Sequence, residues 1–150
     1  MSEEENNKIL ELISKFDDFK FSVYNQSVDE TQAYYMYIIV NSSLKMGKGN
    51  VIIRGCSFSV DVKIGDFNQF NSLSSLAHDV EVGSFNVFMP LTRVSGEVKI
   101  GDLNLFGIGT IILQGIKIGN RVRVAPSSVV MRKTKDACFY MGNPAKKTIL

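Results

Sequence analysis

The chain has 150 residues, of which 45% are hydrophobic and 21% charged, and its formal net charge is +2. This length holds one compact domain with a short appendage, and the composition excludes disordered and membrane-embedded classes. The opening MSEEENN lacks the features of a secretory signal, and the longest apolar run, AYYMYIIV, is too short to span a bilayer. We therefore expect a cytoplasmic protein without membrane insertion. Cys56 and Cys138 have no metal-ligand spacing and are expected to be inert thiols.

Residues 1–43 are expected to form an N-terminal cap. Ile9, Leu12, Ile13 and Phe16 fall on one face of a helix over residues 5–16. The alternation in FKFSVY is typical of a strand, and AYYMYIIV leads into the next segment.

Residues 44–131 carry a six-residue repeat. Fifteen positions spaced by six, from Met46 to Val130, are all apolar, which chance would produce with a probability on the order of one in a hundred thousand. A period of six matches neither a helix nor a simple alternating strand. It fits short strands and bends in which every third bend closes a triangular coil of eighteen residues. The residues two before each apolar position should also point inward, because they share its face.

A second period of eighteen residues lies on top of the first. It is marked by Gly47, Gly65, Gly83, Gly101 and Gly119. We expect these glycines to occupy one corner of each coil, where the bend needs relaxed backbone limits.

The same spacing should stack like residues inside the column. It predicts an amide ladder of Asn50, Asn68, Asn86 and Asn104 that satisfies its own hydrogen bonds. It also predicts an apolar column of Phe70, Phe88 and Phe106.

Residues 132–150 leave the period and are expected to form a C-terminal tail that folds back over the last coils, with a turn at Gly142 and Pro144. Residues 116–150 contain eight lysines and arginines against Asp136 alone. This basic end either meets an anionic ligand or is a solvated surface. No pattern of basic and stacking aromatic residues indicates nucleic-acid binding.

The hexads, the strings GEVKIGD and GIKIGNRVRVAPSSVV and the closing MGNPAKK resemble the hexapeptide-repeat acyltransferases. The likeness runs from about Val40 to the end and is strongest to bacterial sugar acetyltransferases, namely sialic acid O-acetyltransferases and N-acetyltransferases of nucleotide-linked amino sugars. It implies an all-β fold, a left-handed parallel β-helix of about five coils. It further implies a homotrimer with active sites between neighbouring chains, acetyl-CoA as co-substrate and no metal.

The resemblance also implies roles for individual residues. HDVEVG matches the family's catalytic string, so His78 would be the general base and Asp79 its partner. The Gly96 N–H would hold the thioester oxygen, and Asn71 would contact the sugar. Val87, Ile108 and Pro126 would line the CoA groove.

Two departures from the family pattern matter: the first removes a contact to the acyl donor, and the second bears on the substrate. Many relatives carry a second histidine where this chain has Val87. Relatives also precede the column with a nucleotide-sugar-binding domain, whereas about forty residues without a glycine-rich phosphate loop stand here.

His78 is the only histidine of the chain. A neutral imidazole is well suited to accept a proton near pH 7, and the neighbouring inward residues Leu76 and Val80 place His78 at a bend. From composition alone, the favoured interpretation of His78 is an exposed turn residue without a task, and it is the resemblance of HDVEVG to the family string that favours catalysis.

Two functions follow. One is an acetyl-CoA-dependent acetyltransferase acting on a sugar, most simply an amino sugar or nucleotide-linked sugar of a bacterial surface glycan. The other is a non-catalytic trimeric scaffold or regulatory β-helix protein. A γ-type carbonic anhydrase is excluded, because one histidine per chain cannot supply three zinc ligands at a site shared by two chains.

Overall fold

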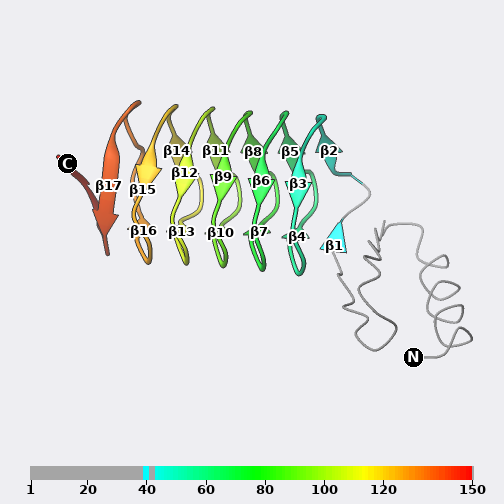
Figure 1. Ribbon diagram of the computed structural model, residues 1–150, viewed down its shortest axis with the longest axis horizontal. Coiled ribbons are helices and arrows are strands. Elements are labelled where there is room, and N and C mark those ends of the chain that lie inside the picture. The colour runs from blue at the N-terminus through cyan, green and yellow to red at the C-terminus, as the bar shows by residue number, and fades with distance from the viewer. Residues whose placement is uncertain (1–38, 41–42, 150) are drawn as a thin grey trace, which may run out of the picture.

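The protein is a column of stacked coils, as seen in a computed structural model that describes residues 39–40 and 43–149 (Figure 1). All regular structure in these residues is β, as predicted, and they include no helix that could cross a membrane. The helix predicted over residues 5–16, the strand FKFSVY and most of AYYMYIIV lie outside the described residues.

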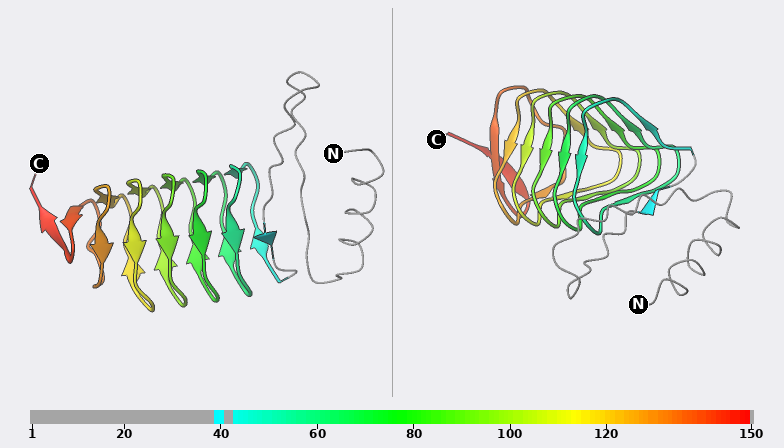
Figure 2. Two further views of the ribbon diagram at one scale, coloured as in Figure 1. Left: turned by 90° about the horizontal axis from the view of Figure 1, so that it is seen from below. Right: turned by 45° about the vertical axis from the view of Figure 1, so that its right-hand side comes forward.

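Short strands form three sheets, which are the three faces of the column (Figure 2). Face 1 consists of β1 (Ile39–Val40), β4 (Ser57–Phe58), β7 (Ser75–Leu76), β10 (Arg93–Val94), β13 (Ile111–Ile112) and β16 (Val129–Val130). Face 2 consists of β2 (Lys45–Met46), β5 (Lys63–Ile64), β8 (Glu81–Val82), β11 (Lys99–Ile100) and β14 (Lys117–Ile118). Face 3 consists of β3 (Val51–Ile52), β6 (Gln69–Phe70), β9 (Val87–Phe88), β12 (Leu105–Phe106), β15 (Arg123–Val124), β17 (Phe139–Gly142) and β18 (Ala145–Thr148).

The predicted six-residue repeat determines which residues of these sheets pair with one another. From β1 to β13, each strand pairs in parallel with the strand eighteen residues later, as Val87 does with Leu105. The second residue of each strand points inward, and all thirteen hexad positions from Phe58 to Val130 are buried. The rings of Phe70, Phe88 and Phe106 stack at centroid distances of 4.6 and 4.9 Å. Burial of each such side chain stabilises the column by about 1.5–3 kcal/mol.

The predicted asparagine ladder is confirmed. Asn86 Oδ1 accepts hydrogen bonds from the Asn104 backbone N–H (3.0 Å) and from Asn104 Nδ2 (2.9 Å). Asn86 Nδ2 in turn donates to Asn68 Oδ1 (2.9 Å), which also accepts the Asn86 backbone N–H. The ladder ends where Asn104 Oδ1 accepts the N–H of Val122. Every amide is thus satisfied by the coil before or after it, which removes the cost of burying it.

The corner glycines have a different role from the one predicted. Gly65 does not have a positive φ, and the left-handed residue of that corner is Phe67, with a φ of 53°. An ideal β-carbon on Gly65 would lie 2.7 Å from the Gly83 carbonyl oxygen and 2.6 Å from Ser84 Oγ. Glycine is therefore needed because successive coils touch there. At the corners after the first, the positive φ falls on the large residues Phe67, Phe85, Leu103 and Arg121, and the N–H of each donates to a carbonyl of the preceding coil, as Phe67 does to Lys48.

The C-terminal segment also differs from the expectation. Instead of folding back over the last coils, β17 adds a shorter coil to face 3 and pairs with β15 at a shift of sixteen residues, Phe139 opposite Arg123. The turn at Gly142 and Pro144 then reverses the chain into β18, antiparallel to β17. The division into segments 1–43, 44–131 and 132–150 stays a prediction.

Replacement of Asn86 by leucine is expected to lower the free energy of unfolding by about 3 kcal/mol, because two buried donors of Asn104 would lose their acceptor. Urea unfolding followed by circular dichroism measures the loss. Gln69→Leu is the control, since this exposed amide should contribute less than about 0.5 kcal/mol. Equal stability of the two variants would contradict the structural role of the ladder.

Candidate active site

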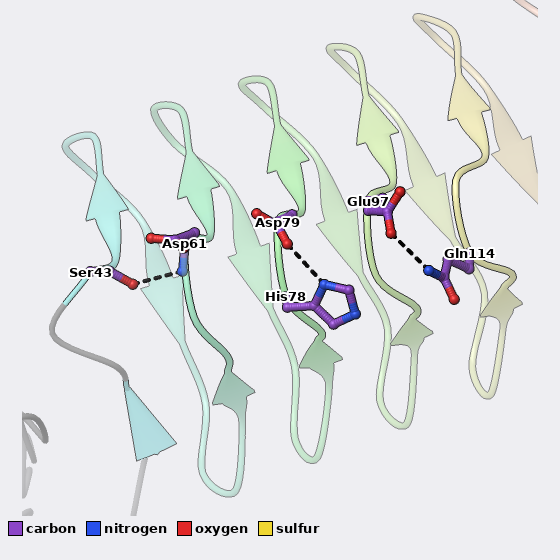
Figure 3. Close-up of polar contacts among 6 residues, drawn as sticks. All are labelled: Ser43, Asp61, His78, Asp79, Glu97 and Gln114. Carbon is purple, nitrogen blue, oxygen red and sulfur yellow. Dashed lines mark hydrogen bonds and ion pairs between the residues drawn. The ribbon is translucent and has the colours of Figure 1, made fainter.

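His78 and Asp79 lie at the corner where face 1 meets face 2, which we call the 1–2 edge. They follow β7 and precede β8. Figure 3 shows Asp79 in a row with Asp61 and Glu97 along this edge, and the imidazole of His78 projecting toward the next coil. Both side chains are open to solvent, with exposed fractions of 46% and 56%. A substrate can therefore reach them from outside the column.

The two side chains form a hydrogen-bonded pair. His78 Nδ1 lies 2.9 Å from Asp79 Oδ2. Because an ionised carboxylate only accepts, Nδ1 carries the proton, and in the neutral ring Nε2 is left as an acceptor. The Asp79 backbone is fixed by its φ of 58° and by the bond from its N–H to the Val60 carbonyl (3.1 Å). The turn thus positions the carboxylate that orients the ring.

Gly96 lies one coil further along the same edge, directly against the imidazole. An ideal β-carbon on Gly96 would overlap Nε2 and Cε1 of His78 and would lie 3.0 Å from Cδ2. No other residue fits there without moving the ring. The Gly96 carbonyl accepts the N–H of Gly115, whereas the Gly96 N–H donates to no acceptor among the described residues. The residue that packs against the imidazole therefore has an N–H that no group within residues 39–40 and 43–149 accepts.

Sequence reasoning missed the acidic neighbours of this pair. Asp61 and Glu97 stand one coil before and one coil after Asp79, at the eighteen-residue offset that could have identified them. The Asp61 N–H donates to Ser43 Oγ at 2.6 Å, and Glu97 Oε1 accepts from Gln114 Nε2 at 2.8 Å. The edge is thus negatively charged on both sides of His78, which favours a cationic group such as an ammonium.

A pocket of about 300 Å³ lies beside Asp79 on face 2 and is lined by Ser43, Lys45, Asp61, Lys63, Asp79 and Glu81. Glu81 bonds Lys63 at 3.1 Å and Lys99 at 3.3 Å. These bonds, that of Lys63 foremost, hold the pKa of Glu81 below its usual value. Lys63, Glu81 and Lys99 thus form one ion-paired row on face 2 beside the 1–2 edge.

The other predicted site residues lie elsewhere on the column. Val87 points outward from β9 on face 3, and Ile108 and Pro126 stack at the corner between face 3 and face 1. Asn71 lies near that corner, where its Nδ2 donates to the Phe88 carbonyl (2.9 Å) and its Oδ1 accepts from Gln69. Within one chain, face 1 separates these residues from His78. The structure therefore brings together His78, Asp79 and Gly96, but not the remaining four.

The described residues contain no cluster of three or more potential metal ligands. Cys56 is buried, and burial raises the pKa of its thiol, so it is a poor nucleophile. Cys138 is half-buried at the start of β17. Neither thiol competes with the imidazole as the reactive group of the 1–2 edge.

No protein-family model and no curated protein matches the sequence. Among solved structures, a histidine-to-alanine mutant of GDP-perosamine N-acetyltransferase from Caulobacter crescentus, in complex with CoA and GDP-perosamine, is 27% identical over 74% of this chain and 53% of that chain, with a TM-score of 0.73. The UDP-N-acetylglucosamine acyltransferase of Arabidopsis is 25% identical over 70% of this chain and 38% of that chain, with a TM-score of 0.67.

The acetyltransferase domain of PglB from Neisseria gonorrhoeae, in complex with acetyl-CoA, shares the fold at 22% identity and a TM-score of 0.70, over 74% of this chain and 57% of that chain. The resemblance to sugar acyltransferases with a β-helix is thereby confirmed. The chain spans between 38% and 57% of the length of these three structures.

Gly96→Ala is expected to push the imidazole off the 1–2 edge and to break its bond to Asp79, because the new methyl group overlaps Nε2. Since His78 is the only histidine, ¹⁵N NMR of the labelled ring reports its tautomer without ambiguity. We expect the Nδ1–H form in the unmodified protein and a shift toward the Nε2–H form in the variant. Gln114→Ala, the corresponding position one coil beyond Gly96, should leave the spectrum unchanged. An unchanged spectrum in Gly96→Ala would contradict the contact.

Proposed function

We propose that the protein is an acetyl-CoA-dependent acetyltransferase that transfers the acetyl group directly to an amine or hydroxyl of a sugar. The observation that carries this proposal is the imidazole of His78, held by Asp79 at an exposed edge with Nε2 against Gly96. A base with an acceptor nitrogen, packed against a residue whose N–H is not used by the described residues, would supply both elements that acyl transfer from a thioester needs. The similarity to CoA-bound acetyltransferases supports this reading.

In the proposed reaction, the acceptor nitrogen or oxygen attacks the thioester carbonyl while His78 Nε2 takes its proton. The resulting tetrahedral intermediate carries a negative oxygen, which the Gly96 N–H would stabilise by about 3–4 kcal/mol. The intermediate then expels the CoA sulfur, and the imidazolium returns the proton to this leaving group. Asp79 keeps the ring oriented and stabilises its positive charge during the transfer.

The site is incomplete in one chain, and we propose a homotrimer that completes it. His78 lies on the 1–2 edge, whereas Asn71, Val87, Ile108 and Pro126 lie on face 3 and its border with face 1. A neighbouring copy that sets its face 3 against this edge would bring the two groups together. CoA would then run between two columns. Because the Asn71 amide is already bonded within its own chain, its predicted contact to the sugar would require the amide to exchange partners.

The acceptor in this proposal is an amino sugar or nucleotide-linked sugar of a bacterial surface glycan. The acidic residues on both sides of His78 would attract the ammonium form of an amino sugar, and the Caulobacter crescentus neighbour holds GDP-perosamine. We place the reaction in the cytoplasm, where acetyl-CoA is made.

The alternative is a non-catalytic trimeric scaffold or regulatory protein. It is favoured by the valine that stands at position 87, where many relatives carry a second histidine.

His78→Ala is expected to lower turnover at least a hundredfold, because the acceptor would lose its general base. The affinity for acetyl-CoA should change little. Transfer of radioactive acetyl from acetyl-CoA to a panel of free and nucleotide-linked amino sugars measures turnover, and calorimetry measures binding. Gln114→Ala is the matched control and should retain full activity.

The outcomes separate the two functions. Absence of CoA binding by the unmodified protein would favour the scaffold. Undiminished turnover by His78→Ala, with binding intact, would refute the role of the imidazole while leaving the enzyme in place.

A further inference from the structure

The corner where face 2 meets face 3, which we call the 2–3 edge, carries an exposed row of large apolar side chains. Phe67, Phe85 and Leu103 each lie at the bend between a strand of face 2 and the next strand of face 3. Their exposed fractions are 48%, 53% and 56%. The rings of Phe67 and Phe85 stack at a centroid distance of 5.4 Å. We call these three residues the apolar ridge.

The backbone of the apolar ridge has a conformation that disfavours large residues. The φ angles of Phe67, Phe85 and Leu103 are 53°, 59° and 60°. Glycine, asparagine and aspartate adopt a positive φ most readily, and the equivalent bends of the 1–2 edge include Asp61 and Asp79. Large apolar residues at such bends are strained, and in the column alone their exposed halves gain nothing from burial. Their presence indicates a surface that another segment or protein covers.

The proposed trimer does not account for the apolar ridge. It brings together the 1–2 edge of one copy and face 3 of the next, with the border between face 3 and face 1. Leu73 and Leu91 also have a positive φ, but they lie at that border, where a neighbouring copy can cover them. The ridge lies on the opposite border of face 3, so its cover must have another origin.

The size of the ridge favours a segment of the same chain over a separate protein. An aromatic side chain offers about 150–250 Å² for burial, so three half-exposed side chains present about 300 Å². A stable interface between separate proteins needs about 800 Å² on each partner. A segment tethered to the column loses little translational freedom when it docks, and a small apolar contact can therefore hold it.

Residues 1–38, which lie outside the described residues, contain a segment whose pattern matches the ridge. The helix predicted over residues 5–16 has an apolar face formed by Ile9, Leu12, Ile13 and Phe16. In a helix, the first and last of these residues are about 10 Å apart along the axis. The two ends of the ridge are two coils apart, which is also about 10 Å. A helix that runs along the 2–3 edge would therefore set an apolar side chain against each coil of the ridge.

The charges beyond the two ends match as well. The bends that precede and follow the ridge on the 2–3 edge hold the exposed residues Lys48 and Arg121. Among residues 39–40 and 43–149, neither cation has a carboxylate within ion-pair distance. The apolar face of the segment is bounded by acids on both sides, namely Glu3, Glu4 and Glu5 before it and Asp17 and Asp18 after it. Helical geometry puts Glu5 and Asp17 about 18 Å apart, and the four coil steps between the two basic bends cover about 19 Å.

We propose that residues 5–16 dock as an amphipathic helix on the apolar ridge of their own column, with acids at both ends of the helix next to Lys48 and Arg121. The 22 residues between Phe16 and Ile39 permit this, because they can span up to about 70 Å. The column from β1 to β16 is five coil steps long, or about 24 Å. Docking on the 2–3 edge leaves the 1–2 edge open, and the inference does not depend on the proposed acyltransferase function.

Fluorescence of the full chain tests the docking. The chain contains no tryptophan, so Phe16→Trp introduces a single reporter on the apolar face of the segment. We expect its emission at the short wavelength of a buried indole. Phe85→Asn in the same background should shift this emission toward that of the urea-unfolded protein and make trypsin cleavage at Lys8 and Lys15 about tenfold faster, because the segment loses its central contact.

The variants are chosen so that the bend itself survives. Asparagine accepts a positive φ, and Phe85→Asn should therefore leave the column folded. Leu73→Asn is the matched control, because Leu73 has a φ of 62° and an exposed fraction of 51% but lies on the other border of face 3. It should change neither the emission nor the rate of cleavage.

A disulfide identifies the chain that supplies the segment. Leu12→Cys combined with Phe85→Cys, in a Cys138→Ser background, should form a disulfide within one chain on oxidation, which a non-reducing denaturing gel detects as a faster-migrating monomer. Leu12→Cys combined with Leu73→Cys should form none. Disulfide-linked dimers in place of the monomer would assign the ridge to a neighbouring copy and overturn docking within one chain. Emission typical of an exposed indole in Phe16→Trp, or buried emission that Phe85→Asn leaves unchanged, would overturn the ridge as the docking surface.

Discussion

Coil-on-coil stacking in a strict register of eighteen residues is the constraint on which this protein depends. The asparagine ladder closes only if each amide meets its copy one coil away, as Asn86 meets Asn104. The corner glycines closely approach the next coil, as Gly65 does at the Gly83 carbonyl. A coil with one residue more or fewer would break both contacts. The buried aromatic stack then adds its stabilisation coil by coil.

The same register builds the candidate active site. His78 and Gly96 are eighteen residues apart, and for this reason the ring lies against a residue without a side chain. The positive φ that recurs at every bend fixes Asp79 beside the imidazole. The contact between His78 and Gly96 therefore forms without any loop insertion. Two residue identities, histidine and glycine, convert an ordinary corner of the column into an exposed imidazole packed against a residue without a side chain.

The interior of the column could be predicted from the sequence because each inward position recurs at a fixed interval. All hexad positions from Phe58 to Val130 are buried as predicted, and the amide ladder has the expected bonds. The prediction that the corner glycines are needed for a relaxed backbone φ was wrong. A period of eighteen residues indicates that glycine is required at a position, but it does not indicate whether the cause is the backbone φ or the close approach of the next coil. The sixteen-residue final coil was missed because it occurs once and creates no period.

The sequence could predict the contacts of the candidate site that lie within one chain, but not those that depend on a neighbouring copy. The eighteen-residue offset places Gly96 against His78 and aligns Asp61 and Glu97 with Asp79. No spacing within one chain relates the 1–2 edge to Val87 or Ile108, because that relation belongs to the packing of separate copies. The C-terminal cations were visible as a basic segment, but no spacing predicted that Arg123 and Lys147 line one pocket of about 470 Å³, because this pocket depends on the pairing of β15, β17 and β18.

The three faces of the column divide the chemistry among them. On face 2, Glu81 forms ion pairs with Lys63 and Lys99 of the same face. The outward side chains of face 3 are uncharged as far as Leu105 and are followed by Arg123, and the 1–2 edge carries the imidazole.

A crystal structure of the protein with CoA tests the account most directly. We predict that the CoA sulfur lies within hydrogen-bond reach of His78 Nε2 in one copy and that the same molecule contacts face 3 of a neighbouring copy. CoA bound away from His78, or His78 covered by a neighbouring copy with no room for a thioester, would contradict the account.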